Sequence, residues 1–170
     1  MCKRAEPLPD KSPDVQRPPS FLAGRWAIML AGGFLAFAVL AVYHNSFSVP
    51  FFFDDVPAIT ENQTIRHLWP LGPVLSPPAG GRTVSGRPLV NLSLAVNHAV
   101  GGTAVWGYHA LNLAIHILAS LILLGIVRRT LLLNPSLRQR FGAAVLPLAL
   151  TVALMWALHP LQTESVTYVV

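Results

Sequence analysis

The sequence predicts an all-α polytopic membrane protein with about three transmembrane helices and one large polar loop. Its 170 residues are 53% hydrophobic and 11% charged, whereas soluble domains carry about 25% charged residues. Three apolar runs are each long enough to cross a hydrocarbon core of about 30 Å; they lie at 25–43, 108–127 and 141–158. The net charge of +5 comes from basic residues at or beyond the ends of these runs. This pattern is typical of membrane flanks, so we expect no nucleic-acid partner.

The chain begins with a segment that should not fold. Residues 1–24 are rich in proline and charge, and they bury too little apolar surface, so we expect a disordered tail. The first span follows at 25–43, with Trp26 and Tyr43 at its ends as interfacial aromatic residues. A cleaved signal peptide is the alternative, but the segment after Tyr43 lacks the small residues of a cleavage site. We therefore favour an uncleaved anchor.

Residues 44–107 form a long segment of mixed polarity between the first two spans. Proline and glycine are frequent over 70–86, which indicates an irregular loop. An amphipathic helix is expected over 87–100, because a proline stands near its start and Gly101-Gly102 at its end. This helix is too short and too polar to span, so it should lie along the membrane surface.

Polar side chains line one face of the second span. They are spaced at i, i+3, i+7 and i+11 and comprise His109, Asn112, His116 and Ser120. Such a stripe is costly to expose to lipid, so it must face other helices or a wet cavity. Interhelical hydrogen bonding that fixes packing is one interpretation, favoured for Asn112 and Ser120. His116 is ionisable within a span, which makes it a candidate for substrate binding.

Charge predicts the orientation of the spans. The tail is basic, and the loop expected over 128–140 has four arginines and no acid, so both should be cytoplasmic, together with the N-terminus. The 44–107 segment and residues 159–170, which begin a second outer loop, then share the outer or lumenal face. A bacterial inner membrane and an endoplasmic-reticulum membrane are both compatible. Asn62 and Asn91 on this face begin glycosylation-acceptor triplets, a pattern that often arises by chance.

Asp54 and Asp55 are adjacent carboxylates that follow three phenylalanines soon after the first span. Aspartate is a preferred N-cap, so a solvated helix cap is one interpretation. The other is functional, because paired carboxylates bind a divalent cation such as Mn or Mg, or take a proton from an attacking hydroxyl. Arg82 and Arg87 lie in the same loop. Their guanidinium groups suit bidentate contact to a phosphate, and attraction to lipid headgroups is the alternative.

Four strings, taken together and in order, resemble one family. They are FFFDDVPAITEN, GRPLVNLSLAVNHAVGG, GYHALNLAIHILASLIL and ALHPLQTESVTYVV, within residues 45–170. As a set they resemble the N-terminal membrane region of the transmembrane-and-TPR-repeat proteins, which include O-mannosyltransferases of the endoplasmic reticulum and bacterial relatives. The resemblance implies a partial GT-C glycosyltransferase fold whose sugar donor is a polyprenyl phosphate.

By this resemblance, Asp54 and Asp55 match the acidic motif of the first outer loop, where one of them would act as base toward an acceptor hydroxyl or hold a divalent cation against the donor phosphate. His159 and Glu164 match the block that begins the second outer loop. The expected donor-binding residues are therefore His159 and Glu164, together with Arg87 and His116. The implied function is transfer of a hexose such as mannose to a protein hydroxyl or another acceptor. The implied partners are membrane lipid, the lipid-linked sugar and an acceptor protein.

The chain departs from the family in two respects. It has about three spans, where the class usually has many more, and it has no repeat at the TPR period of 34 residues. We therefore expect a piece of a longer enzyme, inactive by itself. The sequence leaves two alternatives, namely a non-enzymatic membrane anchor or scaffold of a TPR-repeat protein and a complete three-span membrane subunit.

Overall fold

The computed structural model describes residues 24–77, 79 and 83–169. Within these ranges every regular element is helical. Three helical segments are long and apolar enough to cross a membrane; they are Arg25–Ser48, Val105–Leu133 and Pro135–Ala157. The predicted fold class, an all-α multi-pass membrane protein, is thereby confirmed. The predicted tail, apart from Gly24, and Arg82 lie outside the described residues.

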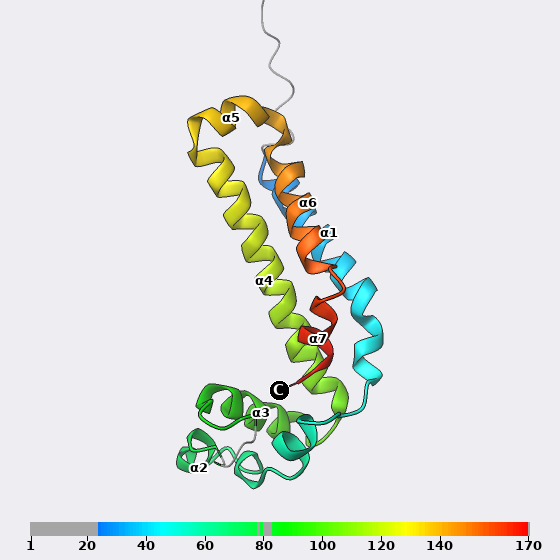
Figure 1. Ribbon diagram of the computed structural model, residues 1–170, viewed down its shortest axis with the longest axis vertical. Coiled ribbons are helices and arrows are strands. Elements are labelled where there is room, and N and C mark those ends of the chain that lie inside the picture. Colours follow the sequence, from blue (N-terminus) through cyan, green and yellow to red (C-terminus); the bar gives the residue numbers. More distant parts are fainter. Residues whose placement is uncertain (1–23, 78, 80–82, 170) are drawn as a thin grey trace, which may run out of the picture.

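Three long helices form the body of the molecule and run side by side along its long axis (Figure 1). They are α1 (Arg25–Tyr43), α4 (Val105–Leu133) and α6 (Val145–Ala157). Small residues line their contacts, since Ala149, Ala153 and Ala157 recur every fourth residue of α6 and are fully buried. On α1, a side chain at Gly32 would meet Leu121 of α4 at 3.3 Å. Small residues at such positions let membrane helices approach closely.

The connection between α4 and α6, predicted as a loop over 128–140, is largely helical. α4 continues to Leu133, because the residues after 127 are mainly arginine and leucine, which are strong helix formers. Asn134 then caps a short helix, α5 (Pro135–Phe141), and its Oδ1 accepts hydrogen bonds from two main-chain N–H groups at 3.0 and 3.2 Å. The chain therefore turns at a single capped corner.

The third span, predicted as one helix over 141–158, begins differently. Gly142 adopts a left-handed φ of +45°, which favours glycine, and a 3₁₀ turn over Gly142–Ala144 precedes α6. Pro147 consequently lies in the first turn of α6. An N–H at that position would have no partner within the helix, so the proline costs no helical hydrogen bond.

The connection between α1 and α4 is a small helical unit across one end of the bundle (Figure 1). Its elements are η2 (His44–Ser48), the π-helical η3 (Val56–Thr60), η4 (Gln63–Ile65), α2 (Leu71–Leu75) and α3 (Pro88–Gly101). The helix expected over 87–100 is α3. The irregular loop expected over 70–86 contains α2, which forms because Val74 is buried in a core shared with α3. That core also includes Ile59, Ile65, Val84, Leu94, Ala95 and Tyr108.

Two buried asparagines join the elements of this unit. The Nδ2 group of Asn62 donates a hydrogen bond to Oδ1 of Asn91 at 2.8 Å. Asn91 in turn donates to the carbonyl of Val74 at 2.7 Å and to the hydroxyl of Thr64 at 2.9 Å. Buried amides require such partners. Both asparagines begin acceptor triplets, yet both side chains are fully buried, so in the folded chain they serve packing.

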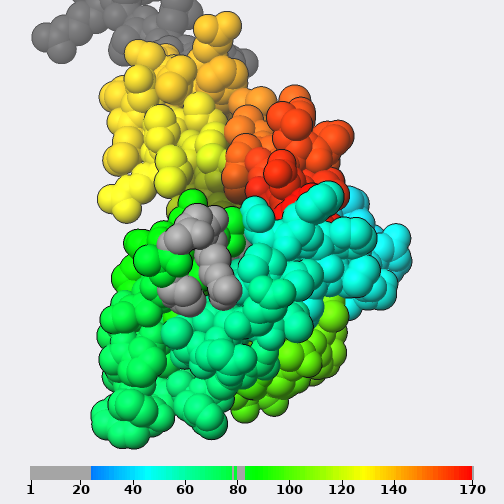
Figure 2. Space-filling view, turned by 60° about the horizontal axis from the view of Figure 1, so that its bottom comes forward, coloured from blue at the N-terminus to red at the C-terminus, as the bar shows by residue number. Residues whose placement is uncertain are grey.

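The C-terminal segment returns to the same end of the molecule. Helix α7 (Gln162–Thr167) lies alongside α4, and Val169 packs against the core of the α1–α4 connection. Figure 2 shows the red C-terminal residues adjoining the cyan part of that connection. All four described carboxylates belong to these two segments; they are Asp54, Asp55, Glu61 and Glu164. The arginines of the α4–α5 corner lie at the opposite end (Figure 1).

Candidate functional site

The two adjacent aspartates lie in different environments. Asp54 is exposed, whereas Asp55 retains only 1% of its accessible surface. Asp55 stands at the N-cap of η3, but its side chain makes no capping hydrogen bond there. The helix-cap interpretation therefore fails for Asp55, and the pair divides into one accessible and one internal carboxylate.

Asp55 connects the acidic segment to the C-terminal segment. Its Oδ1 accepts a hydrogen bond from the main-chain N–H of Val169 at 3.1 Å, and its Oδ2 accepts a longer one from the N–H of Phe52 at 3.4 Å. A carboxylate removed from water needs such donors. Asp55 therefore acts within the fold as a link between segments 114 residues apart.

The peptide group between Tyr168 and Val169 is held from both sides. Its carbonyl accepts a hydrogen bond from Nδ2 of Asn112 at 2.6 Å, and its N–H donates to Asp55. One contact comes from α4 and the other from the α1–α4 connection. The geometry agrees with the packing interpretation of Asn112.

The backbone around Asp54 is irregular on both sides. Phe53 has a φ of +42°, a left-handed conformation that is strained for a bulky residue. The π-helix η3 follows directly after Asp55. Both features are rare and concentrate at functional sites. Asp54 therefore projects from a backbone held in place by the surrounding fold.

His116 joins the three long helices near the end that carries the polar segments. Its Nε2 donates to the carbonyl of Ala157 at 2.9 Å, and the hydroxyl of Tyr43 donates to the same oxygen at 3.1 Å. Ala157 ends α6, so its carbonyl has no partner within that helix. The imidazole also stacks on Trp156, with ring centroids 5.3 Å apart. His116 thus supplies a hydrogen-bond donor to the last carbonyl of α6 and packs against the ring of Trp156.

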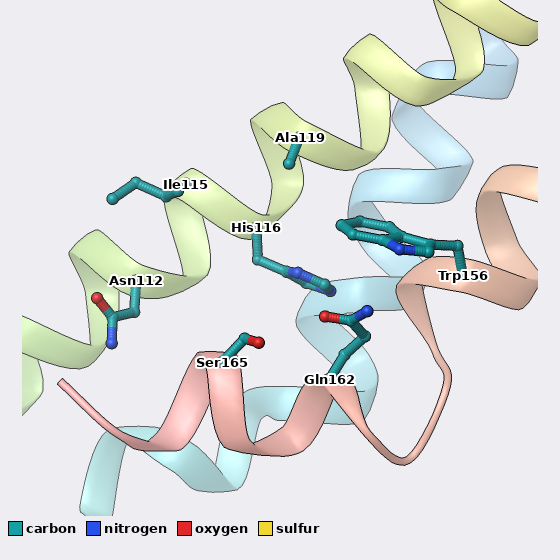
Figure 3. Close-up of a pocket in the computed structure, with 7 residues that line it drawn as sticks. All are labelled: Asn112, Ile115, His116, Ala119, Trp156, Gln162 and Ser165. Atoms are coloured by element: carbon teal, nitrogen blue, oxygen red, sulfur yellow. The ribbon is translucent and has the colours of Figure 1, made fainter. Parts of the chain in front are cut away.

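A cavity of about 220 Å³ lies beside His116. It is lined by Asn112, Ile115, His116, Ala119, Trp156, Gln162 and Ser165. Figure 3 shows the imidazole of His116 directed toward Gln162, with Trp156 above them and Ser165 of α7 nearby. The lining combines apolar side chains with amide, hydroxyl and imidazole groups. Such a lining suits a ligand that is polar at one end and apolar at the other.

A smaller cavity of about 60 Å³ adjoins Asp55. Its lining is Val49, Phe52, Asp55, Thr167 and Tyr168. Since one water occupies about 30 Å³ of liquid volume, this space suits solvent rather than a sugar. The C-terminal segment contributes to both cavities, and Asp54 lines neither of them.

The other predicted donor-binding residues lie on the surface. His159 and Glu164 are exposed, and neither lines the cavity beside His116. The Nδ1 atom of His159 accepts a hydrogen bond from the N–H of Leu161 at 3.3 Å, in the turn before α7. Arg87 is exposed at the N-cap of α3. Asp55 bonds to the C-terminal segment, and His116 lines a cavity with residues of that segment. The other predicted site residues that the structure describes are exposed.

The described residues include no cluster of three or more His, Cys, Asp and Glu side chains suited to a metal ion. Magnesium is often held by one or two carboxylates together with substrate phosphates and water. The Asp54–Asp55 pair therefore suits a cation only if a bound phosphate supplies further oxygens. Asp54 is the accessible member that such a complex would use first.

Several residues around the cavity were not predicted as site residues, and four of them are polar or aromatic and lie outside the stripe of the second span. They are Tyr43, Trp156, Gln162 and Ser165. Tyr43 was assigned only as an interfacial aromatic residue, and its position at the end of an apolar run carries no further signal. These side chains meet His116 from α1, α6 and α7. Their convergence depends on how those helices pack, which spacing along the chain does not reveal.

A second polar contact stabilises the α1–α4 connection outside the spans. The guanidinium of Arg66 donates to Nε2 of His98 at 2.8 Å and also to the carbonyls of Ile59 and Thr60. Since a guanidinium cannot accept, His98 must be neutral in this geometry. Burial, followed by the charges of Arg66 and His67, lowers the pKa of His98. Asn91 and His98, seven residues apart on α3, both make contacts within this unit.

These observations define a multi-pass, all-helical membrane protein with an amphipathic cavity near one end of its helices. No family model and no solved structure matches the chain. The chain is 33% identical over 145 residues to Protein O-mannosyl-transferase TMTC2 of Mus musculus, covering 77% of this chain and 15% of that protein. It is 32% identical over 139 residues to Protein O-mannosyl-transferase TMTC3 of Mus musculus, covering 78% and 14%.

A third relative is Protein O-mannosyl-transferase TMTC4 of Mus musculus, with 31% identity over 163 residues, 89% of this chain and 21% of that protein. The chain belongs to the TMTC family. It spans about 15% of the length of the first of these relatives.

Proposed function

We propose that the chain is part of a GT-C membrane glycosyltransferase, which transfers a sugar from a polyprenyl-phosphate donor to a hydroxyl of a protein or another acceptor. Its relatives are named protein O-mannosyl-transferases, so mannose is the first sugar to test. Because the chain spans only about 15% of the first relative, the activity is proposed for a longer protein that carries these residues. The 170 residues alone are expected to be inactive.

The observation that carries this proposal is the meeting of the two polar segments at one end of the bundle. The hydrogen bond from Val169 to Asp55 holds them together. The exposed Asp54 and the amphipathic cavity beside His116 belong to this same region. An exposed carboxylate on irregular backbone, in a segment joined to the one that lines such a cavity, is a combination expected of a transfer site.

The chemistry needs a base and a group that stabilises the departing phosphate. The acceptor oxygen attacks the anomeric carbon while the bond from that carbon to the phosphate oxygen breaks. The bonding electron pair leaves with the lipid phosphate, which needs no general acid. Asp54 takes the proton of the attacking hydroxyl. Arg87 contacts the departing phosphate. A single displacement of this kind inverts the anomeric configuration.

The remaining candidates have supporting roles in this proposal. His116 contacts the donor from the cavity, and His159 and Glu164 contact it from the neighbouring turn. A divalent cation, Mg or Mn, held by Asp54 and Asp55 together with donor phosphate oxygens, would neutralise part of the phosphate charge. Asp55 also retains its link to Val169, so its role is mainly to position Asp54.

A second candidate function is a non-enzymatic membrane anchor. One observation favours it, namely that Asn112 and His116 both direct hydrogen bonds to main-chain carbonyls of this chain. Side chains used in this way fix the packing of helices and need no ligand. The two functions differ in whether Asp54, whose side chain is exposed, is required for transfer.

The proposed orientation has the N-terminus in the cytoplasm and the site on the outer or lumenal face. Support comes from charge, because four arginines lie at the α4–α5 end and the described carboxylates lie in the opposite segments. Basic residues favour the cytoplasmic side. A bacterial inner membrane and an endoplasmic-reticulum membrane both suit this arrangement.

The test is mannosyl transfer from a polyprenyl-phosphate donor, measured in membranes that contain the longest natural chain with these residues. Asp54→Asn should lower the rate by about 10²–10⁴-fold, the usual contribution of a general base, while insertion and accumulation stay unchanged. Glu61→Gln is the matched control, because Glu61 is another exposed carboxylate of the same connection, and it should retain transfer. A chelator should reduce transfer if the cation is required.

Full transfer in both Asp54→Asn and Asp55→Asn would remove the catalytic role of the pair. Unchanged function in a chain with Asn112→Leu and His116→Leu would in turn support the anchor. The two experiments together separate an enzyme from a scaffold.

A further inference from the structure

A hollow lies at the α4–α5 corner and is not used by the proposed function. This corner is at the end of the bundle opposite the candidate site (Figure 1). The hollow has a volume of about 400 Å³. It is lined by Leu132, Leu133, Pro135, Arg138 and Gln139. One helix end thus supplies apolar side chains, and the next helix supplies a guanidinium and an amide.

The corner is built by Asn134 and Pro135. The side-chain oxygen of Asn134 caps the first N–H groups of α5, and Pro135 occupies the first position of that helix. α5 consequently turns across the end of α4 and packs against it. Arg138 is then held on the helix that closes the hollow, close in sequence to Leu133 but on the other arm of the corner.

Charge at this corner has one sign. Four arginines lie on its two arms, namely Arg128, Arg129, Arg138 and Arg140. The carboxylates in the described part of the chain all belong to the α1–α4 connection and α7. Arginine presents a planar fork of donors that matches phosphate oxygens. The hollow therefore favours an anionic group bearing a phosphate.

The apolar approach to the hollow indicates that this anion carries acyl chains. Ile122, Ile126 and Leu133 are all more than half exposed, and their spacing puts them on one face of α4. This face leads along the span to Leu133 at the lip of the hollow. A lipid with its chains against the face would bring its headgroup to Arg138.

We infer that the α4–α5 corner is a binding site for an anionic phospholipid, with the headgroup phosphate on Arg138 and the acyl chains along the exposed face of α4. Basic pockets beside spanning helices commonly take such headgroups. The site is independent of sugar transfer, so the inference stands whether or not the proposed enzyme activity is correct.

The experiment uses the longest natural chain with these residues, delipidated in detergent and titrated with phosphatidylglycerol or with phosphatidylcholine. Native mass spectrometry counts the retained lipid. Wild-type protein should retain phosphatidylglycerol in preference to phosphatidylcholine. Arg138→Gln should weaken retention of phosphatidylglycerol about fivefold, since each basic residue near an anionic surface contributes about that factor. Arg138 is exposed, so the substitution should leave the fold intact, and thermal unfolding verifies this.

Arg25→Gln provides a control of equal charge change at an exposed arginine of α1 that does not line the hollow, and it should retain phosphatidylglycerol. If wild-type protein retained phosphatidylglycerol and phosphatidylcholine equally, this result alone would overturn the inference. An equal loss in Arg25→Gln would show attraction to net charge only, and displacement of the lipid by inorganic phosphate would show a free-phosphate site. Either result, or unchanged retention in Arg138→Gln, contradicts the lipid site.

Discussion

Asp55 accepts a hydrogen bond from the main-chain N–H of Val169 at 3.1 Å, across 114 residues of sequence. The contact joins the segment after the first span to the segment after the third. Because the carbonyl of the same peptide group is held by Asn112, the C-terminal segment has a fixed position between α4 and the α1–α4 connection. The acidic pair is therefore both a structural link, through Asp55, and an accessible carboxylate, through Asp54.

Removing the link should release the C-terminal segment. Asp55→Ala deletes a hydrogen bond to a buried charged group, which should cost about 1.5–3 kcal/mol of local stability. Hydrogen exchange at the Val169 amide should accelerate accordingly. Asp54→Ala, which changes an exposed side chain, is the matched control and should leave that amide protected. Equal protection in both variants would show that Asp55 does not hold the segment.

The asparagine network should be essential to the α1–α4 connection. Asn91→Leu preserves volume but leaves Asn62 and the carbonyl of Val74 without their buried partner, so thermal unfolding should show a loss of at least about 2 kcal/mol. Asn97 lies on the same helix, α3, and is only half-buried. Asn97→Leu should change stability much less, and comparable losses in both variants would contradict the network.

The contact between Arg66 and His98 predicts that the connection weakens in mild acid. The pKa of His98 is lowered in the folded state from its ordinary value of about 6.5. Between the folded and unfolded pKa values, the unfolded state binds more protons, so stability is complete above about pH 6.5 and is lost as the pH falls. The slope cannot exceed about 1.4 kcal/mol per pH unit for one group.

The contribution of His98 is isolated by measuring the free energy of unfolding of wild type and of His98→Gln as the pH falls below about 6.5. Glutamine can accept the hydrogen bond from Arg66 but does not titrate, so the variant should have the smaller pH dependence. The neighbouring His67→Gln is the control and should retain most of the wild-type slope. A slope that is unchanged in His98→Gln would assign the acid sensitivity to other groups.

Replacing His116 separates packing from ligand binding. Interhelical hydrogen bonds in membranes contribute about 0.6 kcal/mol on average and up to about 1.7 kcal/mol, so His116→Leu should destabilise the bundle by about 1 kcal/mol. If His116 contacts the donor, the loss of transfer should exceed this cost and appear mainly as a raised KM. Ser120→Ala is the control on the same face, because its hydroxyl donates only to the carbonyl of His116. A loss of activity no larger than the loss of stability would leave His116 with a packing role.

Much of the candidate site follows from side-chain chemistry along the chain. The polar stripe on the second span had to face protein, and three of its members do bond to other segments: His109 to the carbonyl of Val49, Asn112 to that of Tyr168 and His116 to that of Ala157. Ser120 bonds instead within its own helix. The stripe was predictable because a membrane leaves polar groups few alternatives. Its partners were not, since they are main-chain carbonyls whose position depends on the fold.

The sequence by itself determined the fold class, because the length and composition of the apolar runs decide which segments can enter a membrane. It also determined the helix α3, whose ends are marked by Pro88 and by Gly101-Gly102. Only the tertiary structure decided that Asp54 faces outward while Asp55 is internal, and that Tyr43 and His116 share the carbonyl of Ala157. Local composition fixes which elements form, but the burial of a carboxylate and the sharing of a helix terminus depend on neighbours that the chain supplies from more than a hundred residues away.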